Sequence, residues 1–183
     1  MIWKKLSKRS LVMDLYKKFE FRTIRPEEAD EAAIVERICF PPHEACTPER
    51  MKRRIGEAAD FFLVAIDREN GMIAGFLNGI ATDEDDFRDE FFTDISLHNP
   101  DGKNIMLMGL TVLPQYRLLG LASELIRTYY RREKDRNREK LVLTCLDEKV
   151  AMYKKLGFKD KGESASVWGG EKWHEMEIYL NIA

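Results

Sequence analysis

The chain is poor in the residues that build covalent or metal-bound frameworks, with three cysteines and three histidines in 183 residues. Cys39, Cys46 and Cys145 have no metal-ligand spacing and the histidines are scattered, so we expect free thiols, no bound metal and a cytoplasmic protein. No apolar run approaches the roughly 18–20 residues that cross a bilayer. Asp14 interrupts the apolar part of the basic N-terminal segment, which therefore does not fit a secretory signal.

A strong charge of one sign is also lacking. The chain carries 30 Lys and Arg against 32 Asp and Glu, for a net charge of −2. This balance gives no overall attraction to nucleic acid or to an anionic membrane, so we expect neither as a partner. Residues 127–140 are basic, but Glu133, Asp135 and Glu139 dilute the charge.

The chain does have enough apolar material for one core. Hydrophobic residues make up 44% of the sequence, which at this length suits a single domain. We expect residues 19–183 to form that domain and residues 1–18 to be an N-terminal extension, helical or frayed. We expect a monomer or a homodimer.

Alternation, turn signals and helical spacing predict an α/β domain. The expected strands lie at 19–25, 61–67, 72–81, 105–113 and 141–146 and in a final pair after residue 158. The expected helices lie at 26–39, 47–59 and 150–157, and a further one begins at 121 and leads into a basic, mixed-charge end at 127–140. Asn-Gly at 70–71 marks a tight hairpin turn. The pattern implies one mixed sheet with helices on both faces.

The first expected helix has an apolar face. Its members are Ala32, Ala33, Val35, Ile38 and Cys39. The helix begins with proline and two glutamates, which suit the positive end of a helix.

The most informative segment, residues 105–126, predicts a strand, a tight loop and a helix. Pro114 ends the strand because proline has no N–H to give to the sheet. Such a corner binds anionic phosphate, since the N–H groups at the helix N-terminus converge, Gly120 admits a close approach and Arg117 adds a positive charge. The same elements also occur in an ordinary strand–loop–helix corner, whereas Walker and three-glycine dinucleotide motifs are absent.

Further motifs agree with this segment. Arg117-x-x-Gly120-x-Ala122, after its strand, resembles the acetyl-coenzyme A loop of the GCN5-related N-acetyltransferase (GNAT) superfamily. Tyr-x-x-x-Gly-Phe at 153–158 is similar to a helix end of that superfamily. Residues 39–51 and 168–180 are similar to the front segment and the closing hairpin of its arylalkylamine N-acetyltransferase branch. The resemblance covers about 19–181, in order.

The resemblance implies an α/β (α+β) domain with a central mixed, twisted sheet and a splayed strand pair that holds acetyl-coenzyme A as co-substrate. Residues 110–113 would line the pantetheine arm, an N–H near Leu110 would polarise the thioester carbonyl, and the loop at 117–123 would hold the pyrophosphate. The implied cofactor-binding residues are Leu110, Thr111, Val112, Leu113, Arg117, Leu118, Leu119, Gly120, Leu121, Ala122 and Ser123.

The resemblance also implies that Tyr153 protonates the departing thiolate. A tyrosine that merely packs beside Leu156 and Phe158 is the alternative. Cys145 lies inside an apolar strand and is expected to be a small core residue rather than a nucleophile.

The general base is harder to assign. Vertebrate arylalkylamine enzymes carry histidines on the strand before the phosphate loop, where this chain has Met106 and Met108. The insect branch uses a glutamate in the loop after the first helix, and Glu44 matches that position. An exposed loop carboxylate without a role is the alternative, and His43 is a neighbouring candidate that can change protonation near neutral pH.

The sequence therefore predicts an acetyl-coenzyme A-dependent acyltransferase. We expect direct transfer, in a ternary complex, to a small primary amine of the arylalkylamine or polyamine type. Acetylation of a protein N-terminus or lysine is one alternative, and a catalytically degenerate acetyl-coenzyme A-binding module is another. The acidic segment 83–94 either draws a cationic amine towards the cleft or is a solvated loop.

Overall fold

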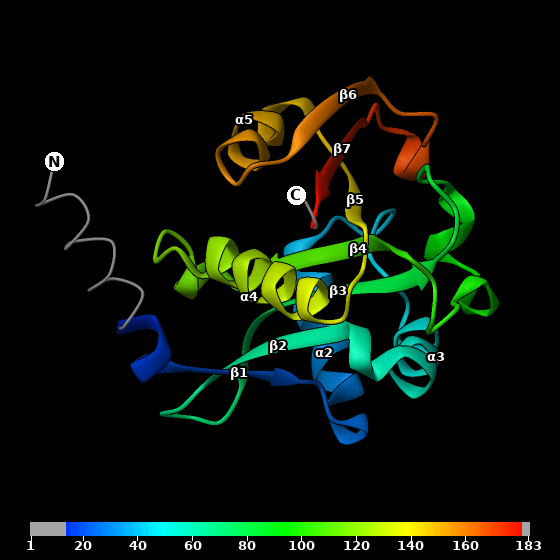
Figure 1. Cartoon of the computed structure of the whole chain (residues 1–183). Coiled ribbons are helices and arrows are strands. Elements are labelled where there is room, and N and C mark those ends of the chain that lie inside the picture. Colours follow the sequence, from blue (N-terminus) through cyan, green and yellow to red (C-terminus); the bar gives the residue numbers. More distant parts are fainter. Residues whose placement is uncertain (1–13, 181–183) are drawn as a thin grey trace, which may run out of the picture.

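The computed structural model describes residues 14–180, which form a seven-stranded sheet with helices on both faces (Figure 1). The strands are β1 (Phe19–Thr23), β2 (Phe62–Asp67), β3 (Ile73–Thr82), β4 (Asn104–Val112), β5 (Lys140–Cys145), β6 (Lys159–Glu163) and β7 (His174–Tyr179). Their order in the sheet is β1-β2-β3-β4-β5-β7-β6, and β4–β5 is the one parallel pair among them. The predicted mixed α/β sheet is confirmed.

The helices divide between two hydrophobic cores. They are α2 (Ala29–Cys39), α3 (Pro48–Ala58), α4 (Leu121–Asp135) and α5 (Asp147–Lys155). On one face Leu125 and Tyr129 of α4 pack in a core that also takes in α5; on the other, Met51 and Ile55 of α3 pack with α2 against β2 and β3. In Figure 1, α4 crosses in front of the middle of the sheet. Each face of the sheet is thus covered, as the sequence predicts.

Local signals explain where several elements begin and end. The Thr47 hydroxyl caps α3 by accepting the Arg50 N–H at 3.3 Å, and Pro48 occupies the first helical position. The hairpin between β2 and β3 turns at Gly71. Short 3-10 helices η3 (Asp89–Phe92) and η4 (Ile95–Leu97) lie in the long segment before β4.

One detail of α2 corrects the prediction from the sequence. Ile38, expected on the buried face, is 53% exposed, whereas Glu36 is 5% exposed. Glu36 follows Ala32 by four residues and Ala33 by three, so it lies in the middle of the buried stripe. A charged side chain therefore occupies a position that apolar periodicity assigns to the core.

The sheet opens between β4 and β5. Pairing between the two strands covers only Asn104–Met106 and Lys140–Val142, although β4 continues to Val112 and β5 to Cys145. A bulge lies just beyond the last paired residues, because Asn78 of β3 opposes Gly109 while the next residue, Gly79, opposes Leu107. The extra residue, Met108, bends β4 away from β5. The predicted splayed strand pair is present.

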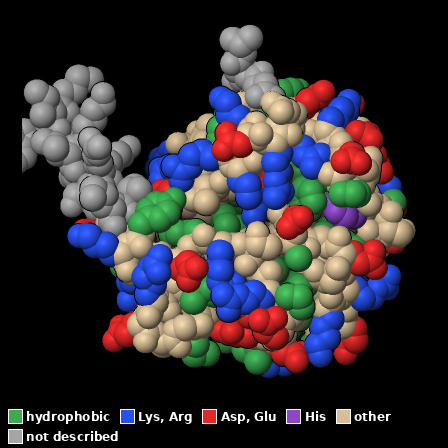
Figure 2. Space-filling model, turned by 60° about the horizontal axis from the view of Figure 1, so that its bottom comes forward, with side chains coloured by type: hydrophobic (Ala, Val, Ile, Leu, Met, Phe, Trp, Pro, Cys, Tyr) green, Lys and Arg blue, Asp and Glu red, His purple; other side chains and the backbone are tan. Residues whose placement is uncertain are grey.

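The basic residues of α4 and of its C-cap form ion pairs with buried glutamates. Arg131 contacts Glu124 at 2.8 Å, and Arg132 and Arg136 contact the fully buried Glu133 at 3.0 and 3.2 Å. Figure 2 shows positive and negative side chains interspersed over the visible face. Much of the basic charge at 127–140 is therefore neutralised within the domain.

The segment before the sheet is described in part. Residues 14–18 are helical, and the Tyr16 hydroxyl donates to Glu124 of α4 at 3.0 Å. The rest of the predicted extension, residues 1–13, lies outside the described residues, as do residues 181–183. Within residues 14–180, none of the helices has the length and hydropathy needed to span a membrane.

Candidate active site

A cleft of about 690 Å³ occupies the opening between β4 and β5. Its walls are the facing ends of these two strands, the start of α4, one side of α5 and the loop between α2 and α3. Apolar side chains such as Met108, Leu110 and Leu143 line the middle, with polar groups at both ends. This is the usual make-up of a small-molecule site.

We call the part formed by residues 110–123 the cofactor end. Gly120, at φ +85°, turns the chain into α4, and the first bond of the helix joins the Glu124 N–H to the Gly120 carbonyl at 3.1 Å. The N–H groups of residues 121–123 precede that bond and point out of the helix N-terminus. Ala122 lines the cleft, so this N-terminus opens onto it and offers an anion-binding position.

Arg117 lies beside this N-terminus on the cleft wall. Its Nε donates to the Val112 carbonyl at 3.1 Å, and the Cys39 thiol donates to the same carbonyl at 3.5 Å. Burial raises the pKa of Cys39, outweighing the opposite effect of Arg117, so the thiol stays protonated at neutral pH. Because the Cys39 thiol and the Val112 carbonyl are both uncharged, they do not neutralise Arg117, and its positive charge is available to a ligand.

The structure separates the predicted cofactor residues into two groups. Leu110, Val112, Arg117, Leu118 and Ala122 line the cleft. Thr111 and Leu113 point to the other face: the Thr111 hydroxyl accepts the Phe76 N–H at 3.2 Å, and Leu113 packs against the core under α2 and α3. Leu121 is buried in the core beneath α4, and the side chains of Leu119 and Ser123 lie outside the cleft wall. Thr111 and Leu121 are buried and can therefore offer a cofactor only their backbone.

Tyr153 brings a hydroxyl to the cleft from α5. Its ring packs edge-on to Phe158 at 5.5 Å and is 8% exposed, so the packing anticipated from the sequence exists alongside the cleft position. Burial raises the pKa of Tyr153, with a smaller contribution from Cys145, and the hydroxyl therefore stays protonated. Burial likewise raises the pKa of Cys145, to about 11. The site offers a neutral O–H donor beside a neutral thiol.

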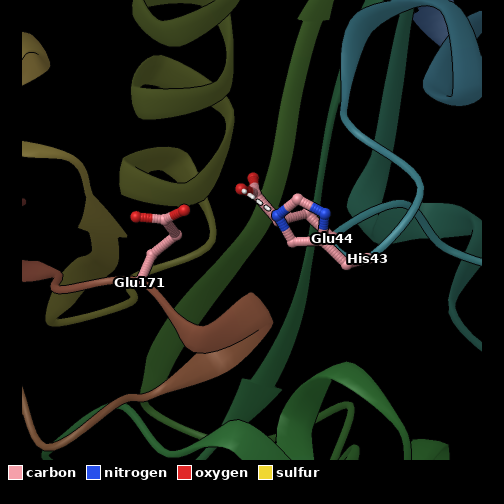
Figure 3. A group of neighbouring side chains, drawn as sticks. All are labelled: His43, Glu44 and Glu171. Atoms are coloured by element: carbon pink, nitrogen blue, oxygen red, sulfur yellow. Dashed lines mark ion pairs between the residues drawn. The ribbon is translucent and has the colours of Figure 1, made fainter.

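At the other end Glu44 lines the cleft, and together with its neighbours His43 and Glu171 it forms a group that we call the acidic mouth. Figure 3 shows Glu171 approaching from the C-terminal segment and facing Glu44 on the α2–α3 loop. His43 Nε2 lies 3.6 Å from Glu44 Oε1. Burial is the main cause that raises the pKa of Glu44; His43 lowers it and Glu171 raises it further.

These three side chains also form a possible cation-ligand set. One ligand atom from each lies within 4.8 Å of the others. The expectation of no bound metal stays a prediction.

Aromatic side chains cover the mouth. Trp168, in the 3-10 helix η6 (Trp168–Gly170), stacks on Phe92 at 4.7 Å and donates its Nε1–H to the Glu44 carbonyl at 3.1 Å. Gly169 has φ +65°, and a Cβ there would lie 2.8 Å from Glu44 Cγ. The sequence analysis identified residues 168–180 by their resemblance to a closing hairpin, but it did not predict that Trp168 contacts the α2–α3 loop.

Sequence reasoning missed a buried polar group on the inner wall of the cleft. Glu36 and Arg54 both line the cleft, and Arg54 donates to the Asn78 side chain at 3.2 Å. Glu36 accepts the Cys46 N–H at 3.0 Å. The one signal in the sequence was a glutamate at a core-facing position of an otherwise apolar helix face.

Comparisons with known proteins agree with this geometry. The model of the acetyltransferase (GNAT) family matches residues 28–158. Serotonin N-acetyltransferase of Mesocricetus auratus is 26% identical over 167 residues, which cover 88% of this chain and 77% of the relative.

Two solved structures share the fold. The loading GNATL domain of CurA from Lyngbya majuscula superposes with a TM-score of 0.77 at 14% identity, over 88% of this chain and 98% of that domain. The GNAT-like decarboxylase GphF, in complex with isobutyryl-CoA, superposes with a TM-score of 0.73 at 19% identity, over 88% of this chain and all of its own.

Proposed function

The chain belongs to the acetyltransferase (GNAT) family, and on that premise we propose that it acetylates a small primary amine with acetyl-coenzyme A as acetyl donor. The acceptor is of the arylalkylamine or polyamine type, and transfer is direct, within a ternary complex. The observation that carries this proposal is the opening between β4 and β5, which leads from the N-terminus of α4 to the acidic mouth.

The cofactor end fits a pyrophosphate. Its N–H groups at residues 121–123, the close approach allowed at Gly120 and the charge of Arg117 all favour an anion at one point. The inward side chains of Leu110 and Val112 provide an apolar channel for the pantetheine arm. Bound acetyl-coenzyme A supplies the activated acetyl thioester. The isobutyryl-CoA bound by GphF, which has the same fold, supports this assignment.

The acceptor end, which comprises the mouth and its aromatic cover, fits an amine. Glu44 and Glu171 attract a cation, and Phe92 and Trp168 provide flat apolar surfaces for an aromatic or aliphatic body. Because Met106 and Met108 stand where the vertebrate arylalkylamine enzymes carry histidines, the nearest available base for the ammonium is a loop carboxylate. We assign that step to Glu44, because burial raises its pKa and makes it a stronger proton acceptor than an exposed carboxylate.

Tyr153 provides the complementary acid. Its protonated hydroxyl lies on the cleft wall and gives a proton to the departing sulfur. Cys39 and Cys145 are not suited to act as nucleophiles. Their pKa values are raised, so both thiols stay neutral, and the thiolate is the nucleophilic form. We further propose that the protein acts in the cytoplasm, as a monomer or a homodimer, without nucleic-acid or membrane partners.

A binding assay followed by a turnover assay tests the proposal. Acetyl-coenzyme A should raise the melting temperature, and a panel of arylalkylamines and polyamines should release free thiol in its presence. Acetylation of peptides but not of amines would favour a protein acetyltransferase. Binding without turnover on either panel would favour a cofactor-binding module, and failure to bind acetyl-coenzyme A would overturn the proposal.

A further inference from the structure

A group of buried polar side chains from three elements lies at the cleft wall, where Glu36 and Arg54 line the cleft and Asn78 contacts Arg54 from behind it. Glu36 of α2 and Arg54 of α3 are each 5% exposed, and Asn78 of β3 is fully buried. Arg54 donates to Asn78 Oδ1 at 3.2 Å and to the Phe92 carbonyl at 3.1 Å. Because its oxygen is taken by Arg54, Asn78 presents the N–H groups of Nδ2 on its other side.

Two atoms of this group have no hydrogen-bond partner among residues 14–180: Glu36 Oε2 and Asn78 Nδ2. Both face the same space beside the Cα of Gly109. A Cβ built on Gly109 would lie 3.3 Å from Nδ2 and 3.6 Å from Oε2. A donor and an acceptor around a space that lacks a side chain are the requirements for one ordered water, which accepts from Nδ2 and donates to Oε2.

This space borders the cleft. Gly109 directly follows the bulged Met108 of β4, and both residues line the cleft together with Glu36. In the proposed reaction the amine meets the thioester against this part of β4. A water beside Gly109 would therefore lie one residue from Leu110, whose N–H is expected to polarise the thioester.

We propose that Glu36, acting through a water held by Asn78 beside Gly109, accepts the second proton that the amine loses during acetyl transfer. This inference rests on the acetyltransferase function proposed above. It adds a proton acceptor at the reacting nitrogen to the one that Glu44 supplies at the mouth.

The protons of the reaction balance with these groups. An ammonium loses one proton before attack, which Glu44 takes and passes to solvent. After the C–N bond forms, the positively charged nitrogen gives its proton to the water, which passes one of its own to Glu36 Oε2. Tyr153 gives its hydroxyl proton to the sulfur as the C–S bond breaks. Glu36 then passes its proton through water in the cleft to the Tyr153 phenolate, which restores both groups. Of the two protons that the ammonium loses, one is thus released to solvent through Glu44, and the other replaces the proton that Tyr153 gave to the thiol.

The electrostatics of the group suit this role. Burial raises the pKa of Glu36, while Arg54 and the Cys46 N–H act in the opposite direction. The other titratable groups that face it are the thiols of Cys39 and Cys46, both kept neutral because burial raises their pKa values. Arg50, from α3, adds a positive charge on the Cys46 side. A carboxylate with a raised pKa and one unpartnered oxygen can accept a proton and later release it.

Two substitutions of Glu36 separate proton transfer from packing. Glu36→Gln keeps the size of the side chain and the bond from the Cys46 N–H but cannot accept a proton, whereas Glu36→Asp keeps the carboxylate and loses a methylene. We expect kcat to fall by about 10²- to 10⁴-fold in Glu36→Gln and by less in Glu36→Asp, with KM for acetyl-coenzyme A little changed. Thermal stability should follow the opposite order, because Asp leaves a gap. If Glu36→Gln instead lost less activity than Glu36→Asp, so that kcat followed thermal stability, the proposal would be overturned.

A third variant removes the water and keeps the carboxylate. In Gly109→Ala the methyl group occupies the space between Glu36 and Asn78, so kcat should fall at least tenfold while acetyl-coenzyme A affinity is retained. Glu31→Gln, on the same helix, is the matched control, since its oxygen accepts the Ile73 N–H away from the cleft and should leave kcat unchanged. Wild-type kcat in Gly109→Ala would contradict the water-mediated step.

A readout that does not depend on turnover distinguishes this inference from the proposed function. A ¹³C NMR titration of glutamate carboxyls in the free protein should show one signal, lost in Glu36→Gln, with a pKa above that of ordinary glutamates. If that signal is present but the wild type acetylates no amine, the proposed acetyltransferase function fails. The assignment of Glu36 as a buried proton acceptor would still stand. An ordinary pKa for Glu36 would overturn the inference even in an active enzyme.

Discussion

The two ends of the cleft are built in different ways. The cofactor end comes from one continuous stretch, residues 110–123, and relies on backbone: a strand that leaves its neighbour, a glycine at φ +85° and the start of α4. The acceptor end combines side chains from segments far apart, and Trp168 and Glu44, which are in contact there, are 124 residues apart in the chain. Recognition by backbone follows a local motif, whereas acceptor choice depends on contacts that only the fold creates.

The largest expected effect comes from breaking the cofactor end at Gly120. Gly120→Glu places a negative side chain where the pyrophosphate should bind, so we expect acetyl-coenzyme A affinity to fall at least 100-fold in calorimetry. Gly120→Ala is the control, because both variants bear the cost of a left-handed non-glycine residue, about 1–2 kcal/mol. Normal binding by Gly120→Glu would mean that the phosphate lies elsewhere.

Removing the hydroxyl of Tyr153 should leave binding intact and slow the reaction. Tyr153→Phe retains the ring packing against Phe158, and we expect kcat to fall by about 10- to 1000-fold with KM for acetyl-coenzyme A little changed. Tyr130→Phe, whose hydroxyl contacts the Tyr179 carbonyl outside the cleft, should behave as wild type. An unchanged kcat in Tyr153→Phe would assign that residue to packing alone.

At the acceptor end, Glu44→Gln should reduce kcat/KM in a pH-dependent way. The amine is mostly protonated at pH 7, so we expect a loss of about tenfold there, which shrinks at high pH as free amine accumulates. The raised pKa of Glu44 means that the wild-type rate should rise with pH as this carboxyl ionises, and that limb should disappear in the variant. A uniform loss at every pH would indicate a structural role for Glu44, and no loss would favour His43.

Aromatic cover at the mouth should matter for the acceptor and not for the cofactor. Trp168→Leu removes the ring that stacks on Phe92, so KM for an aromatic amine should rise by about three- to tenfold, in line with the roughly 0.5–1.5 kcal/mol of an aromatic pair. KM for acetyl-coenzyme A should stay within twofold of wild type. Equal effects on both substrates would show that the two ends are not separable.

The smallest expected effect concerns stability against pH. The pKa of Glu36 is raised in the folded state, so the folded protein binds a proton at this residue more tightly than the unfolded chain does. The free energy of unfolding should therefore fall as pH rises from about 4 through the raised pKa. Glu36→Gln should lack this decline. At pH 8 its free energy of unfolding should therefore equal that of wild type or exceed it by about 1 kcal/mol. Parallel pH profiles measured by denaturant unfolding would contradict the raised pKa.

What could be predicted from the sequence follows the same division. The strands, the hairpin at Gly71, the cap at Thr47 and the corner around Gly120 all depend on local propensities, and the structure confirms them. Apolar periodicity failed on α2, where Ile38 is exposed and Glu36 is buried, because a buried carboxylate is stabilised by partners on other elements. The contact of Trp168 with Glu44 had no local signal either.

Direct transfer requires both ends of the cleft to be filled at once, and initial-rate kinetics test this most directly. With acetyl-coenzyme A and an accepted amine both varied, double-reciprocal plots should intersect, and mass spectrometry after incubation with acetyl-coenzyme A alone should show unmodified protein. Parallel lines together with an acetylated cysteine would contradict the account, because acetyl transfer would then pass through the enzyme rather than directly between the two ends.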